Sequence, residues 1–117
     1  MKIKLQTGES IEIPCRKVGF FGKFSGLMFS RREKAEVLLF DMKKPMAIHS
    51  FFVFFDFIAV WIDEKNTVVK WKIVKPWSPY EMPEKHFSKL IEIPISRRYH
   101  NIVALVVGER FKKEYRL

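Results

Sequence analysis

The chain has 117 residues, of which 48% are hydrophobic and 15% aromatic, and its 22 Lys and Arg outnumber 13 Asp and Glu for a formal charge of +9. This apolar content excludes an intrinsically disordered chain, and the length suits a single β-rich domain over residues 1–117 that buries about two-thirds of its unfolded surface. Cys15 is the only cysteine, which excludes a fold held by disulfides within the chain.

The N-terminal part of the chain predicts short strands and one helical turn. Residues 2–6 and 11–13 alternate polar and apolar side chains around the turn at residues 7–10, which predicts a β-hairpin. Apolar residues then recur at spacings of three to four, so we expect a short helix or helical turn over residues 22–29. A polar connection follows at residues 30–34, and residues 35–40 read as a strand.

The middle of the chain holds the most apolar segments. Residues 48–54 and 57–62 predict two buried strands that meet near Asp56, the second covered on both faces. Five of the twelve Phe lie between residues 51 and 57, so we expect them in the core. After a turn at residues 64–66, residues 67–75 predict a strand of period two. One face of it carries Val69, Trp71 and Ile73, and the other carries Lys70 and Lys72.

The C-terminal part begins with a loop over residues 76–85, which contains three prolines. Residues 90–95 predict a strand that Pro94 places near an edge or an end. Ser96 is expected to begin a short helix that ends near residue 101, before late strands at residues 103–107 and 110–115. Together the elements predict an α+β domain with a mostly antiparallel sheet, a small curled or barrel-like core, and one or two short helices.

The N-terminal residues lack the apolar segment of a secretory signal, so a cytoplasmic location is expected. Residues 46–62 are the most membrane-like stretch, but His49, Ser50 and Asp56 interrupt them and they fall short of the about 20 apolar residues of a spanning helix. We therefore expect no membrane association. The low Asn and Gln content resembles that of hyperthermophile proteins.

His49 and Ser50 are the most conspicuous polar residues because they interrupt an apolar segment. One interpretation is a pocket-facing pair that binds a ligand or moves a proton, and the other is a strand histidine and serine with structural hydrogen bonds. The three His and the one Cys lack metal-ligand spacing, so we expect no metal and no cofactor. The frames of a nucleophilic serine and of a phosphate-binding loop are missing, so no catalytic residue is assigned.

Basic residues are spread along the chain, mostly as doublets such as Arg16-Lys17, and Lys75 is closely followed by Trp77 and Tyr80. Cations beside aromatic rings suit phosphate contacts combined with base stacking, which favours nucleic-acid binding. Lysines on exposed strands also protect sheet edges and maintain solubility. Both interpretations stay open at this point.

Three segments in this order resemble a known family. They are Gly26-Leu27-Met28 followed by Arg31, the apolar block from Leu39 through His49-Ser50 to Asp63, and Val74-Lys75-Pro76-Trp77. Together with residues 90–94 and Gly108-Glu109 they are similar to the family catalogued as domain of unknown function 192, in an archaeal-type variant. The resemblance covers about residues 16–111, and it implies a compact β-rich α+β domain with no established activity. This chain has Asp56 and Ile58 where members often have a proline and an aspartate.

The points where polar groups break the apolar pattern define the candidate binding site, which consists of Gly26, Met28, Arg31, His49, Ser50, Lys75 and Trp77. We expect a non-enzymatic domain that binds a small anionic ligand or a protein partner there. The first alternative is an accessory protein that binds RNA or single-stranded nucleic acid. The second is a small enzyme that uses His49 as a base.

Overall fold

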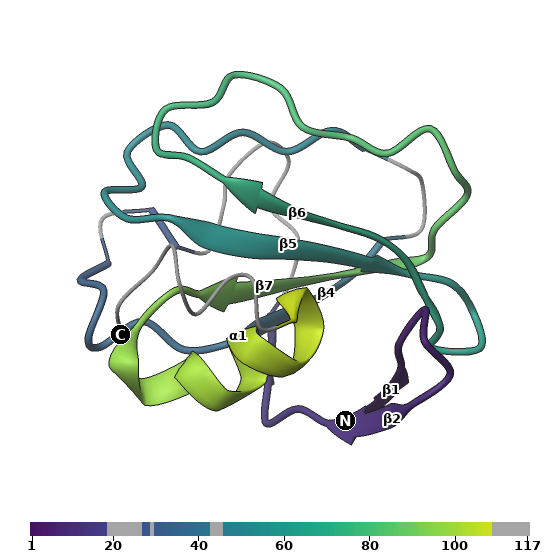
Figure 1. Ribbon diagram of the computed structural model, residues 1–117. Helices are drawn as coiled ribbons and strands as arrows, with labels where there is room; N and C mark the ends of the chain where they lie inside the picture. Colours follow the sequence, from purple (N-terminus) through teal and green to yellow (C-terminus); the bar gives the residue numbers. More distant parts are fainter. Residues whose placement is uncertain (19–26, 29, 43–45, 109–117) are drawn as a thin grey trace.

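The computed structural model describes residues 1–18, 27–28, 30–42 and 46–108 (Figure 1). Near the N-terminus, β1 (Lys2–Lys4) and β2 (Ser10–Glu12) form an antiparallel pair. A separate sheet contains five strands, namely β3 (Arg16–Val18), β4 (Leu38–Asp41), β5 (Phe57–Ile62), β6 (Val68–Val74) and β7 (Lys89–Pro94). The 3-10 helix η1 (Arg97–Tyr99) and the α-helix α1 (His100–Val107) follow β7.

The five-stranded sheet has the order β3-β4-β7-β5-β6 and is open, with β3 and β6 at its two edges. Only its first pair, β3 and β4, is parallel, with Arg16 opposite Leu38. The pairs β4–β7, β5–β7 and β5–β6 are antiparallel. The predicted α+β class with a mostly antiparallel sheet is confirmed, in the form of an open sheet.

Both faces of this sheet are buried. On one face, Ile58, Val60 and Ile91 pack with residues of the β1–β2 hairpin and with Val103 of α1, which lies across the sheet in Figure 1. On the other face, Phe57 and Trp61 belong to a second cluster. That cluster is completed mainly by side chains from loops, including Ile48, Val53, Phe55 and Phe87. Regular secondary structure therefore covers one face of the sheet, and loops cover the other face.

Several predicted elements are confirmed. The N-terminal hairpin has its turn at Gly8, whose φ of 96° is a conformation that glycine adopts without strain. The strand over residues 57–62 is β5, and all six of its residues are buried. Asn66, with φ of 60°, lies in the predicted turn, and residues 76–85 form a loop apart from an isolated bridge at Glu81.

The predicted strand over residues 48–54 is wrong. Ile48 forms only an isolated bridge with Glu81, and residues 51–52 form a turn in which Phe52 has a φ of 62°. A left-handed residue cannot continue a strand, so the segment folds back as a loop. The expectation that Phe51, Phe52 and Phe54 lie in the core is wrong as well, because they are 36%, 40% and 59% exposed.

The predicted strand over residues 103–107 is also wrong, since these residues belong to α1. The β-branched residues suggested a strand, but Val103 and Val106 are three residues apart and both are buried, which is the spacing of one helical face. Ser96 does precede the helical region, at the N-cap of η1, although its hydroxyl makes no capping hydrogen bond. The predictions for residues 22–26 and 110–115 lie outside the described residues.

Two details of the strands sharpen the prediction. Pro94 ends β7, as one of the two predicted alternatives has it, and β7 lies inside the sheet between β4 and β5. The register between β5 and β6 shifts between Trp61 and Ile62 of β5. In β6, Val69 packs against the cluster on the loop-covered face, whereas Trp71 and Ile73 pack against the cluster on the helix-covered face. A bulge explains this, because one extra residue exchanges the faces of the side chains before it. Within the described parts of the chain, no helix has the length and apolar character needed to cross a membrane.

Replacement of Ile91 by Ala tests the importance of the doubly covered strands. Ile91 is fully buried in β7, so Ile91→Ala leaves a cavity and should lower the free energy of unfolding by about 2–5 kcal/mol. Ile73→Ala is the matched control, because Ile73 lies half-buried on the edge strand β6 and should cost less. Urea unfolding followed by circular dichroism measures both, and equal losses would contradict the interpretation.

Candidate functional site

Ser50 joins the two loops that cover one face of the sheet. Its hydroxyl donates to the Lys75 carbonyl at 2.6 Å and accepts from the Ser78 backbone N–H at 2.6 Å. Its backbone N–H donates to the Ser78 carbonyl, and its carbonyl accepts from the backbone N–H of Trp77 at 2.9 Å. Ser50 is completely buried, so these bonds form away from water, where they hold the loops in one arrangement.

Four aromatic side chains gather on the outside of these loops. The Trp77 ring lies 4.9 Å from that of Phe52, 6.2 Å from that of Phe51 and 6.1 Å from that of Phe54, measured between centroids, and all three pairs meet edge to face. Trp77 is 48% exposed, which lies between the exposed fractions of Phe52 and Phe54. We call Phe51, Phe52, Phe54 and Trp77 the aromatic surface. A contiguous patch of solvent-exposed apolar side chains marks an interaction site more often than single exposed residues do.

The backbone under this surface is strained at two positions. Phe52 and Trp77 have φ of 62° and 63°, in the left-handed region that bulky side chains rarely adopt. Each such residue costs about 1–3 kcal/mol and persists only where its surroundings fix it. The Trp77 backbone N–H donates a hydrogen bond to the Ser50 carbonyl, so the buried hydrogen bonds of Ser50 supply that constraint.

The charges beside the aromatic surface are paired. The ammonium group of Lys75 lies 2.5 Å from a carboxylate oxygen of Asp56, and that of Lys72 lies 2.7 Å from one of Glu81. The Ser78 hydroxyl also donates to Glu81 at 2.9 Å. Lys75 therefore stands next to Trp77, as predicted, but its charge is already compensated by a carboxylate.

His49 lies at the border of the aromatic surface, with its ring 4.9 Å from that of Phe51. Its Nδ1 accepts a hydrogen bond from the Phe51 backbone N–H at 3.2 Å. A backbone N–H can only donate, so the neutral imidazole carries its proton on Nε2. Nε2 then offers no lone pair and Nδ1 already accepts a hydrogen bond, which is unfavourable for a general base.

The predicted site is brought together only in part. His49, Ser50, Lys75 and Trp77 belong to one hydrogen-bonded and aromatic assembly. Met28 is half-buried against the loop-covered cluster, and Arg31 is exposed at a turn where its carbonyl accepts from the Ala35 N–H. Contacts of the described residues do not join Arg31 to the assembly. Gly26 lies outside the described residues.

The other two histidines make local contacts. His86 pairs through Nε2 with a carboxylate oxygen of Glu64, and His100 Nδ1 lies 2.9 Å from the Arg97 carbonyl. The hydrogen bond from His86 is the main reason why the pKa of Glu64 is lower than usual. Over the described ranges, no group of three or more His, Cys, Asp and Glu could hold a metal ion.

Fold and site together define a small β-rich α+β domain with an exposed aromatic surface built on loops. The chain is similar to UPF0127 protein TK1120 of Thermococcus kodakarensis, with 32% identity over 79 residues that make up 65% of this chain and 50% of the relative. The chain thus spans about half the length of the curated relative it matches. The relative's name denotes an uncharacterised family, which agrees with an uncharacterised small domain.

No family model matches the chain. No solved structure matches it either. The resemblance to domain of unknown function 192 accordingly stays a prediction.

Replacement of Ser50 by Ala tests the loop assembly. Ser50→Ala removes the partner of the Lys75 carbonyl and of the Ser78 N–H, and unsatisfied buried groups of this kind cost about 1–3 kcal/mol of unfolding free energy. Ser88→Ala is the matched control, because within the described residues the buried Ser88 hydroxyl has no hydrogen-bond partner. We expect the control to stay within about 0.5 kcal/mol of the wild type in urea unfolding. A neutral Ser50→Ala would contradict a constraining role.

The pair of His86 and Glu64 predicts a pH effect that can be read at one carboxylate. His86→Gln removes the ion pair, so the pKa of Glu64 should rise toward its ordinary value. A lowered folded-state pKa stabilises the fold above the ordinary pKa of Glu, and this contribution disappears as the pH falls through the lowered value. Titration of the Glu64 carboxyl by NMR in both proteins measures the shift, and an unchanged pKa would refute the assignment.

Proposed function

We propose that this chain is a non-enzymatic binding domain that docks an acidic protein partner through its aromatic surface. The observation that carries the proposal is the group of exposed rings around Trp77, fixed from beneath by the buried hydrogen bonds of Ser50. Residues of this kind commonly contribute most of the binding free energy at protein interfaces.

The arrangement of the rings favours a protein partner over a small anion at this place. Aromatic side chains have few rotatable bonds, and the contacts with Trp77 already restrict them, so little conformational entropy remains to be lost on binding. The paired charges of Lys75 with Asp56 and of Lys72 with Glu81 form a polar border beside the rings. An apolar centre with a polar rim is the usual anatomy of a protein interface.

Net charge supports an acidic partner in preference to a second copy of the chain. Two copies that each carry a formal charge of +9 repel one another, whereas an acidic protein is attracted. The attraction accelerates encounter, and the aromatic contacts then provide the lasting affinity.

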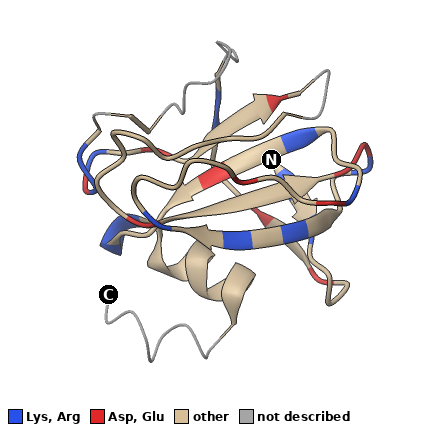
Figure 2. Ribbon diagram, turned by 90° about the horizontal axis from the view of Figure 1, so that it is seen from above, with Lys and Arg blue, Asp and Glu red and all other residues tan. Residues whose placement is uncertain are grey.

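The distribution of the cations speaks against nucleic acid as the partner. Figure 2 shows Lys and Arg on several strands and loops, interspersed with Asp and Glu. Arg16 and Lys17 lie on the edge strand β3, and Lys70 and Lys72 lie on the opposite edge strand β6. Cations at both edges of a sheet block pairing with other chains, which accounts for them without a phosphate backbone.

The position of Phe54 allows a direct test of the proposed surface. Phe54 is replaced by a photo-reactive phenylalanine analogue, and the matched control carries the analogue at Leu105 of α1, which is 52% exposed. After illumination in a lysate, we expect one acidic protein to be crosslinked from position 54 and not from position 105. The crosslinked protein is then purified, and its Kd is measured by calorimetry for the wild type, Phe54→Ser and Tyr80→Ser.

Phe54→Ser should weaken binding at least about tenfold, because truncation of an interface anchor costs more than about 1.4 kcal/mol. Tyr80 is more exposed than Phe54 and makes no ring contact with Trp77, so Tyr80→Ser should bind as the wild type does. Equal crosslinking from both positions, or equal affinity of all three proteins, would refute the proposal. Binding of single-stranded RNA with an affinity that falls steeply with salt would replace it.

A further inference from the structure

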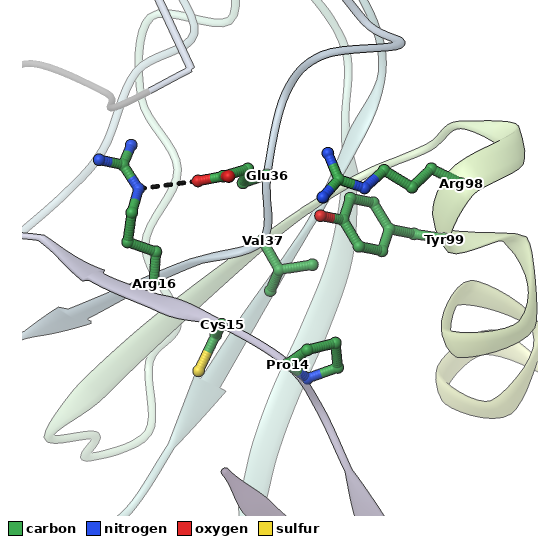
Figure 3. Close-up of a pocket in the computed structure, with 7 residues that line it drawn as sticks. All are labelled: Pro14, Cys15, Arg16, Glu36, Val37, Arg98 and Tyr99. Atoms are coloured by element: carbon green, nitrogen blue, oxygen red, sulfur yellow. Dashed lines mark ion pairs between the residues drawn. The ribbon is translucent and has the colours of Figure 1, made fainter.

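A pocket lies where the parallel strands β3 and β4 begin, beside η1 (Figure 3). It is a pocket of about 240 Å³ lined by residues 14–16, 36–37 and 98–99. The Arg16 backbone N–H donates to the Val37 carbonyl at 2.9 Å, which fixes two of these segments to one another. None of the lining residues belongs to the aromatic surface, so the pocket is a separate site.

The pocket combines an apolar floor with a charged rim. Val37 is fully buried and Tyr99 is 7% exposed, and both belong to the core cluster on the helix-covered face of the sheet. Arg16, Glu36 and Arg98 stand around this floor in Figure 3. Two guanidinium groups and one carboxylate leave the rim with one net positive charge.

Arg98 is the cation of the rim that is set up to receive an anion. Its guanidinium carbon lies 5.1 Å from the centroid of the Tyr99 ring, and the buried tyrosine restrains it through a cation–π contact. Arg16, in contrast, donates its Nε–H toward Glu36 at 2.9 Å. No ion pair involves Arg98 among the residues that the structure describes. A restrained guanidinium offers paired N–H donors that match a carboxylate.

We infer that this pocket binds a small monocarboxylate with a compact apolar or aromatic body. The carboxylate lies against the guanidinium of Arg98, and the apolar body lies against the exposed Pro14 and the ring of Tyr99, with the fully buried Val37 beneath. Arg16 and Glu36 compensate each other's charge, so the rim keeps one net positive charge and suits a monoanion. An apolar cavity of about 150 Å³ holds a benzene ring, so a pocket of 240 Å³ has room for a ring and its carboxylate.

This inference goes beyond the proposed function, because the two sites lie on opposite faces of the sheet. Val37 and Tyr99 belong to one core cluster, whereas Val53 and Phe55, which anchor the loop of the aromatic surface, belong to the other. Substitutions at the pocket rim therefore leave the aromatic surface intact, and failure at one site does not decide the other.

The test is an NMR titration of the full chain with benzoate at low salt, compared with benzamide and acetate. Benzoate has both the carboxylate and the ring, benzamide lacks the charge, and acetate lacks the ring. We expect benzoate to shift the backbone amide resonances of Val37, Arg98 and Tyr99 with a Kd at least about fivefold lower than that of either control, since a charge-assisted hydrogen bond is about twice as strong as a neutral one. Equal affinity for benzoate and benzamide, or shifts spread over the whole surface, would overturn the inference.

Two neighbouring arginines provide the matched variants. Arg98→Gln removes the guanidinium at the pocket, and Arg97→Gln removes the same charge from an exposed residue of η1 that does not line it. We expect a loss of benzoate binding of at least about fivefold in the first and little change in the second. Arg98→Lys keeps the charge but not the planar donors, so it should restore only part of the affinity. Equal effects of Arg97→Gln and Arg98→Gln would reduce the result to general electrostatic attraction and refute the site. Thermal unfolding of all variants verifies that they are folded.

Discussion

The structure depends on the burial of β5 and β7 from both sides of one sheet. All six residues of β5 are buried, and the same is true of β7 from Leu90 to Pro94. Strands whose buried residues are almost all apolar are stable only when each face is covered, since any exposed face would return apolar area to water. A hairpin and a helix cover one face, but loops cover the other, and a loop must satisfy its own backbone hydrogen bonds. Ser50 meets that demand with both its side chain and its backbone.

The same arrangement explains why aromatic side chains are exposed to solvent. Val53 and Phe55 turn inward to cover the sheet, so the adjacent Phe52 and Phe54 must face outward. The turn at Phe52 and the left-handed conformation of Trp77 bring these rings together across the two loops. Strain that is kept at two bulky residues of one surface is characteristic of functional segments. The cover of the core and the candidate interface are thus opposite sides of one loop assembly.

The sequence predicts those parts of the fold in which local pattern and tertiary burial agree. The all-apolar strand β5 and the hairpin around Gly8 are of this kind. Residues 103–107 contain three β-branched valines but fold as a helix, because packing of Val103 and Val106 against the sheet outweighs their intrinsic preference. At the site, polar interruption revealed Ser50 and its neighbours. The exposed phenylalanines could not be found, because a continuously apolar segment has no periodicity that tells inward from outward residues. The rim of the pocket joins segments far apart in the sequence, and only the fold brings them together.

The net charge has different consequences at different places on this molecule. On the edge strands β3 and β6, cations prevent further strand pairing, and beside Trp77 the lysines are matched by Asp56 and Glu81. Exposed and paired charges of this type contribute little to specific affinity, since solvent and salt screen them. Arg98 differs because a buried tyrosine ring holds its guanidinium over an apolar floor. A candidate binding cation therefore differs from the other basic residues in its restraint and its surroundings. Neither property can be predicted from the formal net charge of +9.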